Sequence, residues 1–231
     1  MSPPRAGLPS PPNNITTMPV EKNHRPQALP EPTLRRLPWY LAYVTRLMRG
    51  GAEYVSSTQI AAAVGVDSSQ IAKDLSFLNV RGKTRIGYEV PVLERELRDF
   101  LGFRRSHNAV VIGAGSLGSA LMRDSGLHRY GLNIVAAFDI DPQIAGGEIA
   151  GIPIYNITRM KEIVPALDVD IAVLTVPVDV AQSLADDGME AGIRAIWNFT
   201  PSRISVREGC VVQNTSLYAH LAVMYNRLET Q

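Results

Sequence analysis

The sequence predicts an α/β protein with an N-terminal winged helix-turn-helix domain and a C-terminal Rossmann-type parallel-sheet domain that ends in a helix. Two short capped helical patterns stand on either side of a glycine, and a basic glycine-containing turn follows them. Later, a buried-strand pattern runs directly into a GxGxxG motif. We expect a disordered Pro-rich tail over 1–32, a DNA-binding domain over 33–106, a dinucleotide-binding domain over 107–214 and a dimerisation helix over 215–231.

Composition narrows the class of protein. The 231 residues are 45% hydrophobic, enough for two cores, and no stretch holds the eighteen consecutive apolar residues of a membrane span. No signal-peptide pattern opens the chain, so we expect a cytoplasmic protein without membrane association. Cys210 is the single cysteine, which excludes an intrachain disulfide and a multi-cysteine metal cluster. No metal site is expected, and any redox sensing has to use a bound cofactor.

The net charge of +1 divides unevenly along the chain. Residues 33–105 hold 12 Lys/Arg against 7 Asp/Glu, whereas residues 106–231 hold 8 against 13. A basic front half suits a domain that binds a polyanion such as DNA, although charge alone would fit chance asymmetry equally well.

Nine of the sixteen prolines lie in the first 32 residues, with few aliphatic side chains to bury, which predicts disorder. Met18 is a possible alternative start. From Thr33 the pattern becomes helical and ends at Gly50-Gly51; its recurring apolar residues are Leu34, Leu37, Leu41, Val44, Leu47 and Met48.

A helix-turn-helix follows. Ser56 caps a short helix over residues 60–64, Gly65 closes it in a left-handed turn, and residues 67–70 repeat the cap. The second helix, over residues 70–80, is the predicted DNA-recognition helix. Ile71, Leu75 and Leu78 share its inner face. The outward side chains, and so the candidates for DNA contact, are Ser69, Gln70, Lys73, Ser76 and Phe77.

Residues 80–88 combine glycines, β-formers and basic residues as a hairpin wing would. Arg81, Lys83 and Arg85 would contact phosphates or the minor groove, whereas a solvated basic turn is the alternative. An amphipathic helix with Val92, Leu93, Leu97, Phe100 and Leu101 then ends at Gly102, and residues 104–107 form the linker.

The dinucleotide motif sits in the required context, between a strand over residues 109–112 and a helix that includes residues 120–122. Gly113 permits a tight turn, Gly115 lets a pyrophosphate approach the backbone, and Gly118 lets the helix pack closely on the strand. The candidate phosphate-binding residues are Gly113, Ala114, Gly115, Ser116, Leu117 and Gly118.

An acidic residue ends the second strand, which we place at residues 134–138. The Asp139 carboxylate can accept hydrogen bonds from the adenosine ribose of NAD(H) and would repel the 2′-phosphate of NADP(H). Asp141 is the second candidate, although it could simply cap the next turn. We therefore expect NAD(H) as the cofactor.

Two further strands, over residues 170–175 and 195–198, end where an open parallel sheet binds its ligand. Thr175, Val176 and Pro177 at the first exit, with Asn198 and Phe199 at the second, should border the nicotinamide, or else are ordinary strand exits. The last helix carries an apolar stripe that packs on its own domain or on a partner subunit; the stripe contains Leu217, Leu221, Met224 and Leu228.

From Pro32 onward the order of these features resembles the Rex family of redox-sensing bacterial transcriptional repressors. The matching segments are Arg36-Leu-Pro-Trp-Tyr40, Val55-Ser-Ser57, Gln70-Ile71, Lys73-Asp-Leu-Ser76, Gly87-Tyr88, the motif over 113–118, Phe138-Asp-Ile-Asp-Pro142, Leu174-Thr-Val-Pro177 and Asn198-Phe199. The resemblance adds Ser57 to the DNA-contact candidates. It implies a homodimer with swapped C-terminal helices that binds double-stranded operator DNA in the NAD+ or free state and releases it with NADH.

The chain departs from the usual family pattern in the DNA-binding half. Ala72 replaces an Arg of the recognition helix, and the wing reads Leu78-Asn-Val-Arg81 and Thr84-Arg-Ile-Gly-Tyr88. A polar latch of some members, made of Arg, Tyr and Asp, would fall on Ala42, Asp124 and Ser216, so it is not expected here.

The competing class is an enzyme, either an NAD-dependent dehydrogenase or a CoA-binding protein. A dehydrogenase needs a proton donor beside the hydride acceptor. Tyr155 and Tyr218 lack a lysine four residues on, and His128 and His220 suit a surface or an interface better than catalysis. We therefore predict no enzymatic activity.

Overall fold

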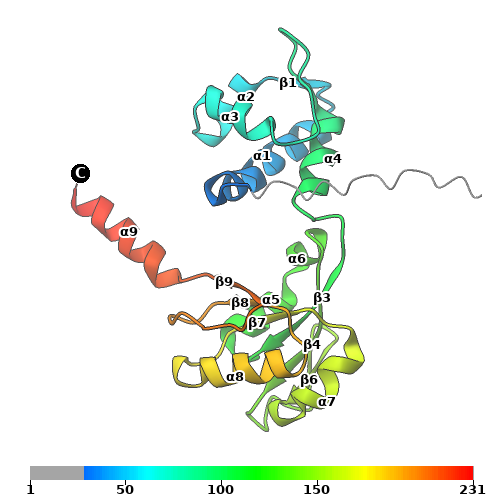
Figure 1. The fold of residues 1–231 in the computed structure, drawn as a ribbon, viewed down its shortest axis with the longest axis vertical. Helices are drawn as coiled ribbons and strands as arrows, with labels where there is room; N and C mark the ends of the chain where they lie inside the picture. Colours follow the sequence, from blue (N-terminus) through cyan, green and yellow to red (C-terminus); the bar gives the residue numbers. More distant parts are fainter. Residues whose placement is uncertain (1–28, 231) are drawn as a thin grey trace, which may run out of the picture.

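The computed structural model describes residues 29–230, which form two packed units and a projecting C-terminal helix (Figure 1). The possible start at Met18 and the predicted tail up to residue 28 lie outside the described residues. The tail was predicted too long at its end, because residues 31 and 32 already belong to the first helix. Pro32 suits that position, since a proline in the first helical turn loses no hydrogen bond.

The first unit is a small helical bundle with a two-stranded sheet. Its core buries the inner face of every helix, with Leu37, Leu41, Ile71 and Leu93 fully enclosed. The elements are α1 (Glu31–Arg49), β1 (Tyr54–Val55), α2 (Ser57–Val64), α3 (Ser68–Leu75), β2 (Tyr88–Glu89) and α4 (Val90–Phe100). The apolar stripe of α1 is narrower than predicted, because Leu34 and Met48 face solvent and Tyr40 is buried in the core.

The helix-turn-helix forms as the capping residues indicate. The Ser56 hydroxyl accepts from the Gln59 N–H at 3.2 Å, the Gln59 side chain accepts from the Ser56 N–H, and Gly65 has a φ of 68°. Asp67 caps α3 through the Ser69 N–H at 2.8 Å. The predicted extent of the recognition helix over 70–80 is wrong. The regular helix ends at Leu75, and turns follow it.

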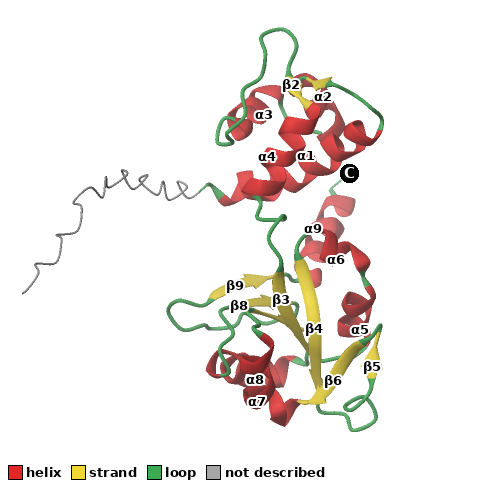
Figure 2. Ribbon diagram, turned by 90° about the vertical axis from the view of Figure 1, so that its right-hand side faces the viewer, coloured by secondary structure: helices red, strands yellow, loops and turns green. Residues whose placement is uncertain are grey.

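The second unit is a seven-stranded sheet in the order β5-β6-β4-β3-β7-β8-β9 (Figure 2). All neighbouring strands are parallel except β5 and β6. The chain runs outward from the centre on one side and then on the other, which is the doubly wound dinucleotide-binding order. The strands are β3 (His107–Ile112), β4 (Leu132–Asp139), β5 (Glu148–Ile149), β6 (Ile152–Asn156), β7 (Ile171–Leu174), β8 (Ala195–Asn198) and β9 (Val211–Asn214).

Different helices cover the two faces of this sheet. Residues such as Phe138 and Leu174 pack on one face against α7 and α8, whereas Val111 and Val173 pack on the other face with Met122 of α5. The helical segments are α5 (Ser116–Arg123), α6 (Ser125–Arg129), η1 (Ile157–Arg159), α7 (Met160–Ile163), η2 (Val164–Leu167) and α8 (Val178–Glu190). His107, which we placed in the linker, is the first residue of β3.

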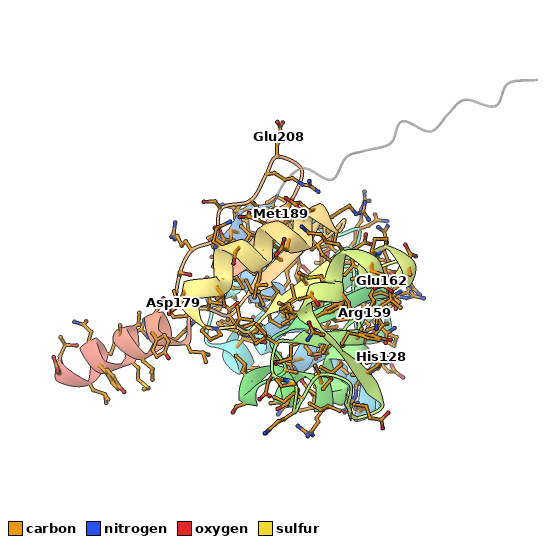
Figure 3. The ribbon with its side chains drawn as sticks, turned by 90° about the horizontal axis from the view of Figure 1, so that it is seen from below. His128, Arg159, Glu162, Asp179, Met189 and Glu208 are labelled. Carbon is orange, nitrogen blue, oxygen red and sulfur yellow. The ribbon has the colours of Figure 1, made fainter. Side chains whose placement is uncertain are left out.

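The terminal helix α9 (Leu217–Glu229) stands apart from the rest of the chain (Figures 1 and 3). The Ser216 hydroxyl caps it by accepting from the Ala219 N–H at 3.2 Å. No residue of α9 is buried, although the helix carries seven large exposed apolar side chains, which are Leu217, Tyr218, Leu221, Val223, Met224, Tyr225 and Leu228.

Candidate functional site

The glycine-rich loop after β3 is shaped by close packing at two glycines and by open space at the third. Gly113 has a φ of 95°, and a Cβ there would lie 2.8 Å from the Thr175 carbonyl oxygen. A Cβ on Gly118 would collide with the Gly113 carbonyl and lie 2.9 Å from the Thr175 hydroxyl. A Cβ on Gly115 would meet no atom within 4 Å. Gly113 and Gly118 are therefore needed for the fold, whereas Gly115 leaves room above the loop for a ligand.

Asp139 orients this loop from the end of β4. One carboxylate oxygen accepts from the Ala114 N–H at 2.7 Å, and the other accepts from the Asp141 N–H at 2.9 Å. Each oxygen keeps a free lone pair, so the carboxylate can still accept from ribose hydroxyls. Asp141 accepts from the Gln143 N–H at 2.9 Å, which is the turn-capping role that we had left open for it.

Thr175 fastens the opposite wall. Its hydroxyl donates to the Gly113 carbonyl at 2.7 Å, and its N–H donates to the Ile112 carbonyl at 2.9 Å. These bonds join the exits of β3 and β7, the two central strands between which the chain reverses direction. Open α/β sheets bind their ligands at this reversal point.

A hollow of about 270 Å³ lies at these strand exits. It brings together six predicted residues, which are Gly113, Gly115, Asp139, Thr175, Val176 and Pro177. Sequence analysis missed the remaining lining, which is Ile140, Ile157, Val180, Ser183 and Leu184. Ile140 was detectable, because an apolar residue that immediately follows the strand-ending acid must lie at the same edge.

The other predicted loop residues support the hollow without lining it. Ala114 and Gly118 are buried, Leu117 is half-buried, and Ser116 is exposed at the start of α5. A phosphate can still approach the N–H groups of this first helical turn, since they have no partner within the helix.

The side chains of Asn198 and Phe199 are engaged at the exit of β8. Asn198 is fully buried, and its amide group donates to the Ser202 carbonyl at 2.7 Å and to the Asn214 side chain at 2.8 Å. Its side-chain oxygen accepts from the Thr200 N–H at 2.9 Å, so Asn198 organises the loop after β8. The Phe199 ring packs against Trp197, with the ring centres 4.6 Å apart. Neither side chain lines the hollow.

Among the described residues, no His, Lys or Tyr lines the hollow, so no proton donor of the usual dehydrogenase kind faces it. Asp179 lies near the N-terminus of α8. Figure 3 shows His128 on a different side of the dinucleotide-binding unit from Asp179. Cys210 is half-buried, and burial raises the pKa of its thiol, which disfavours the reactive thiolate.

The candidate DNA-binding surface is built on α3. Ser69, Lys73, Ser76 and Phe77 are exposed, whereas Ser57 at the start of α2 is half-buried. The hydroxyls of Ser69 in α3 and of Ser76, which follows α3, are both engaged locally. Ser69 donates to Asp67 at 2.6 Å, and Ser76 donates to the Lys73 carbonyl at 2.7 Å. The inward faces of Ile71, Leu75 and Leu78 are confirmed by their burial.

Gln70 corrects the predicted outward set. Its side-chain amide donates to the Asp74 carboxylate at 2.8 Å, so it turns back toward the bundle and is half-buried. The reason is its spacing, because residues four apart on a helix lie one above the other.

Asp74 is the buried hub that joins α3 to α1, and sequence analysis did not assign it a role. The carboxylate is fully buried and accepts from Thr33 at 3.0 Å, from Arg36 at 2.7 and 2.8 Å, from Tyr40 at 2.8 Å and from Gln70. Burial by itself would raise the pKa of Asp74, but the hydrogen bonds, that of Arg36 foremost, outweigh it and lower the pKa to about 2. Burial and the bond to Asp74 raise the pKa of Tyr40 to about 12.

The wing is a short turn closed by two backbone hydrogen bonds between Lys83 and Gly87, at 2.7 and 2.9 Å. Its base is the pairing of β1 with β2. Arg81 and Arg85 are exposed, whereas the Lys83 ammonium lies 2.5 Å from the Glu89 carboxylate.

These features define a class of protein in which a helix-turn-helix unit with a wing is joined to a dinucleotide-binding unit. Comparison with known proteins agrees with both halves. Residues 28–76 match the family described as putative DNA-binding protein N-terminus, and residues 104–202 match the CoA binding domain family.

Relatives over most of the chain make the assignment specific. The redox-sensing transcriptional repressor Rex of Porphyromonas gingivalis is 58% identical over 202 residues, which cover 87% of this chain and 93% of the relative. The Rex protein of Bacteroides fragilis is 56% identical over 200 residues, covering 87% and 91%. The chain belongs to the Rex family of redox-sensing transcriptional repressors.

Solved structures of a Rex-family repressor, RSP, have the same fold. RSP in complex with NAD+ and operator DNA is 31% identical and superposes with a TM-score of 0.84, covering 88% of this chain and 94% of that one. RSP in complex with NADH is 32% identical with a TM-score of 0.80, covering 88% and 96%.

Proposed function

We propose that this chain is a repressor that binds operator DNA in its NAD+-bound or free state and releases the DNA when NADH binds. The observation that carries the proposal is a dinucleotide cleft without a proton donor, in the same chain as a helix-turn-helix. The pair of RSP structures supports it, because that relative was captured with NAD+ and operator DNA and also with NADH.

The hollow at the strand exits suits NAD(H) on three grounds. The space over Gly115 and the start of α5 fit a pyrophosphate, and the oriented Asp139 carboxylate fits ribose hydroxyls. Ile140, Ile157 and Val180 provide an apolar wall. We assign the backbone contacts to residues 113–118 and the ribose contact to Asp139.

The proposed DNA contacts are the exposed face of α3 and the wing. Lys73 supplies a positive charge, Ser57, Ser69 and Ser76 supply hydroxyls, and Arg81 and Arg85 extend the basic surface. Gln70 remains a candidate, since only one N–H of its half-buried side-chain amide is bonded to Asp74.

We propose that two copies associate through α9, with each helix swapped into the partner subunit, which covers the exposed apolar side chains of the helix. In the single chain, seven large apolar side chains of α9 are exposed to solvent, which is energetically unfavourable and is relieved when a partner subunit buries them. We retain the DNA-binding domain, with its start moved to residue 31, the dinucleotide-binding domain, the C-terminal dimerisation helix and a cytoplasmic location as part of this proposal. Among residues 29–230, no helix is long and apolar enough to cross a membrane.

The decisive experiment measures binding of the purified chain to labelled promoter fragments of its own genome, with NAD+, with NADH and without cofactor. We expect binding with NAD+ or alone and at least a tenfold loss at saturating NADH, which corresponds to about 1.4 kcal/mol of coupling between the two sites. Equal binding in all three conditions would refute the switch. Steady oxidation of NADH with a keto acid would favour the enzyme alternative.

A further inference from the structure

The three basic side chains of the wing have different surroundings. The Lys83 ammonium donates to the Glu89 carboxylate at 2.5 Å and to the Tyr54 hydroxyl at 3.0 Å, and it lies 5.0 Å from the centre of the Tyr54 ring. Tyr54 and Glu89 are directly paired across the two strands β1 and β2. The Lys83 ammonium is therefore paired with Glu89 and Tyr54 at the base of the wing, although 52% of the Lys83 side chain is exposed.

The backbone of Lys83 also closes the turn. Its N–H and carbonyl are bonded to the carbonyl and N–H of Gly87, and its carbonyl accepts from the Ile86 N–H at 3.1 Å. Gly87 has a φ of 107°, and a Cβ there would overlap the Val55 carbonyl. Backbone and side chain of Lys83 thus both fix the turn against β1.

Arg85 occupies the tip of this turn in a left-handed conformation, with a φ of 64°. A non-glycine residue is unfavourable at such a φ, and this strain is found most often where a side chain has a function. Both Arg85 and the neighbouring Ile86 are exposed, and Ile86 has 52% of its surface in solvent. The guanidinium is therefore held out on a closed turn.

We propose that Lys83 is not a DNA contact but the strut that holds the wing on β1 and β2, and that this strut positions Arg85 to contact DNA. The inference rests on the proposed function. It gives Lys83 a structural role and Arg85 a role in DNA contact, although both were grouped as basic candidates for DNA contact in the sequence.

The sign of a charge change separates the strut from a simple electrostatic contact. Glu89→Gln removes a negative charge near the DNA, so charge alone predicts tighter binding. The same change breaks the ion pair to Lys83, so the strut predicts weaker binding. We expect about twofold to fivefold weaker binding, in the range of a partly exposed ion pair. Unchanged or tighter binding by Glu89→Gln would overturn the inference.

A double-mutant cycle tests the order of action. Arg85→Gly suits the left-handed turn and removes only the side chain, so it should fold normally and bind DNA more weakly. If Lys83 acts through Arg85, then Lys83→Met weakens binding in the wild-type chain and has little further effect in the Arg85→Gly background. Additive losses would show that Lys83 contacts DNA itself, and wild-type binding by Arg85→Gly would exclude Arg85; either result overturns the proposal.

The probe is a labelled duplex selected by the wild-type chain from a random library, and affinity is measured by fluorescence anisotropy at one fixed salt concentration. Urea unfolding of every variant, followed by the fluorescence of Trp39, serves as the folding control, since Trp39 lies in α1 of the same unit as the wing. A wild-type chain that selects no duplex would refute the proposed function together with this inference. Normal wild-type selection with additive variants would refute the inference alone.

Discussion

Replacing Asp74 tests whether the buried hub holds the recognition helix in place. The carboxylate accepts hydrogen bonds from three side chains of α1 and one of α3, and it is fully buried. Asp74→Ala would leave the Arg36 guanidinium facing an apolar gap, which costs about 3–5 kcal/mol for a broken buried pair. That loss is a large part of the roughly 5–15 kcal/mol by which a domain is stable.

The pH dependence gives the same hub a second signature. The pKa of Asp74 is lowered from 3.8 to about 2 in the folded chain, so its contribution is present above pH 4 and is lost as the pH falls toward 2. The difference corresponds to about 2 kcal/mol. Asp74→Asn keeps the shape but cannot titrate, and its stability should therefore approach that of the wild type as the solution is acidified.

The assay is urea unfolding at pH 7, 5 and 3. Tryptophan fluorescence follows both units, because Trp39 lies in α1 and Trp197 lies in β8. Asp67→Asn is the matched control on the same helix, since asparagine caps a helix about as well as aspartate. A loss below about 1 kcal/mol for Asp74→Ala, or an unchanged gap between Asp74→Asn and wild type across this pH range, would refute the role of the hub.

Three further outcomes test the cofactor site and the terminal helix. Gly118→Ala should lower the free energy of unfolding by at least about 2 kcal/mol, measured by thermal unfolding, because its Cβ would overlap the loop. Gly115→Ala should fold normally but bind NADH about tenfold more weakly than the wild type, because its Cβ would project into the space for the ligand. Equal behaviour of the two variants would contradict that distinction. Asp139→Asn should weaken NADH binding about tenfold to a hundredfold in fluorescence titrations, with Asp141→Asn near wild type; the reverse order would move the ribose contact to Asp141. Leu221→Glu should halve the mass found by sedimentation, and an unchanged mass would exclude α9 as the interface.

The sequence was sufficient for features set by local chemistry. The cap at Ser56, the left-handed Gly65 and the buried run of β3 all depend on residues close together in the chain, and each was predicted correctly. The strands β5, β6 and β9 were not predicted. They are short or lie toward the edges of the sheet, so they lack the long apolar pattern that marks β3 and β4.

The missed features depend on contacts between distant residues. In the sequence, Asp74 was only one polar residue of a segment that resembles the Rex family. Its structural role could not be predicted, because its partners on α1 lie 34 to 41 positions away in the chain. Asn198 was placed in the cofactor site from its position at a strand exit, but its bonds to Ser202 and Asn214 turn the side chain inward. Strand position predicts which edge a residue occupies, and only the fold shows which way its side chain points.

The same contacts limit how the cofactor could act on DNA. The hydrogen bonds of Asp74 connect α3 to α1, and both helices pack in one hydrophobic core. We therefore expect α3 to move together with the rest of the winged-helix unit and not independently. The connection between the units contacts the second unit where Phe103 packs edge-on against Tyr130, with ring centres 5.0 Å apart. If the chain acts as the dimeric repressor proposed above, we therefore expect a change in the cofactor hollow to move each winged helix as a rigid body and to alter the spacing of the two winged helices rather than the shape of either.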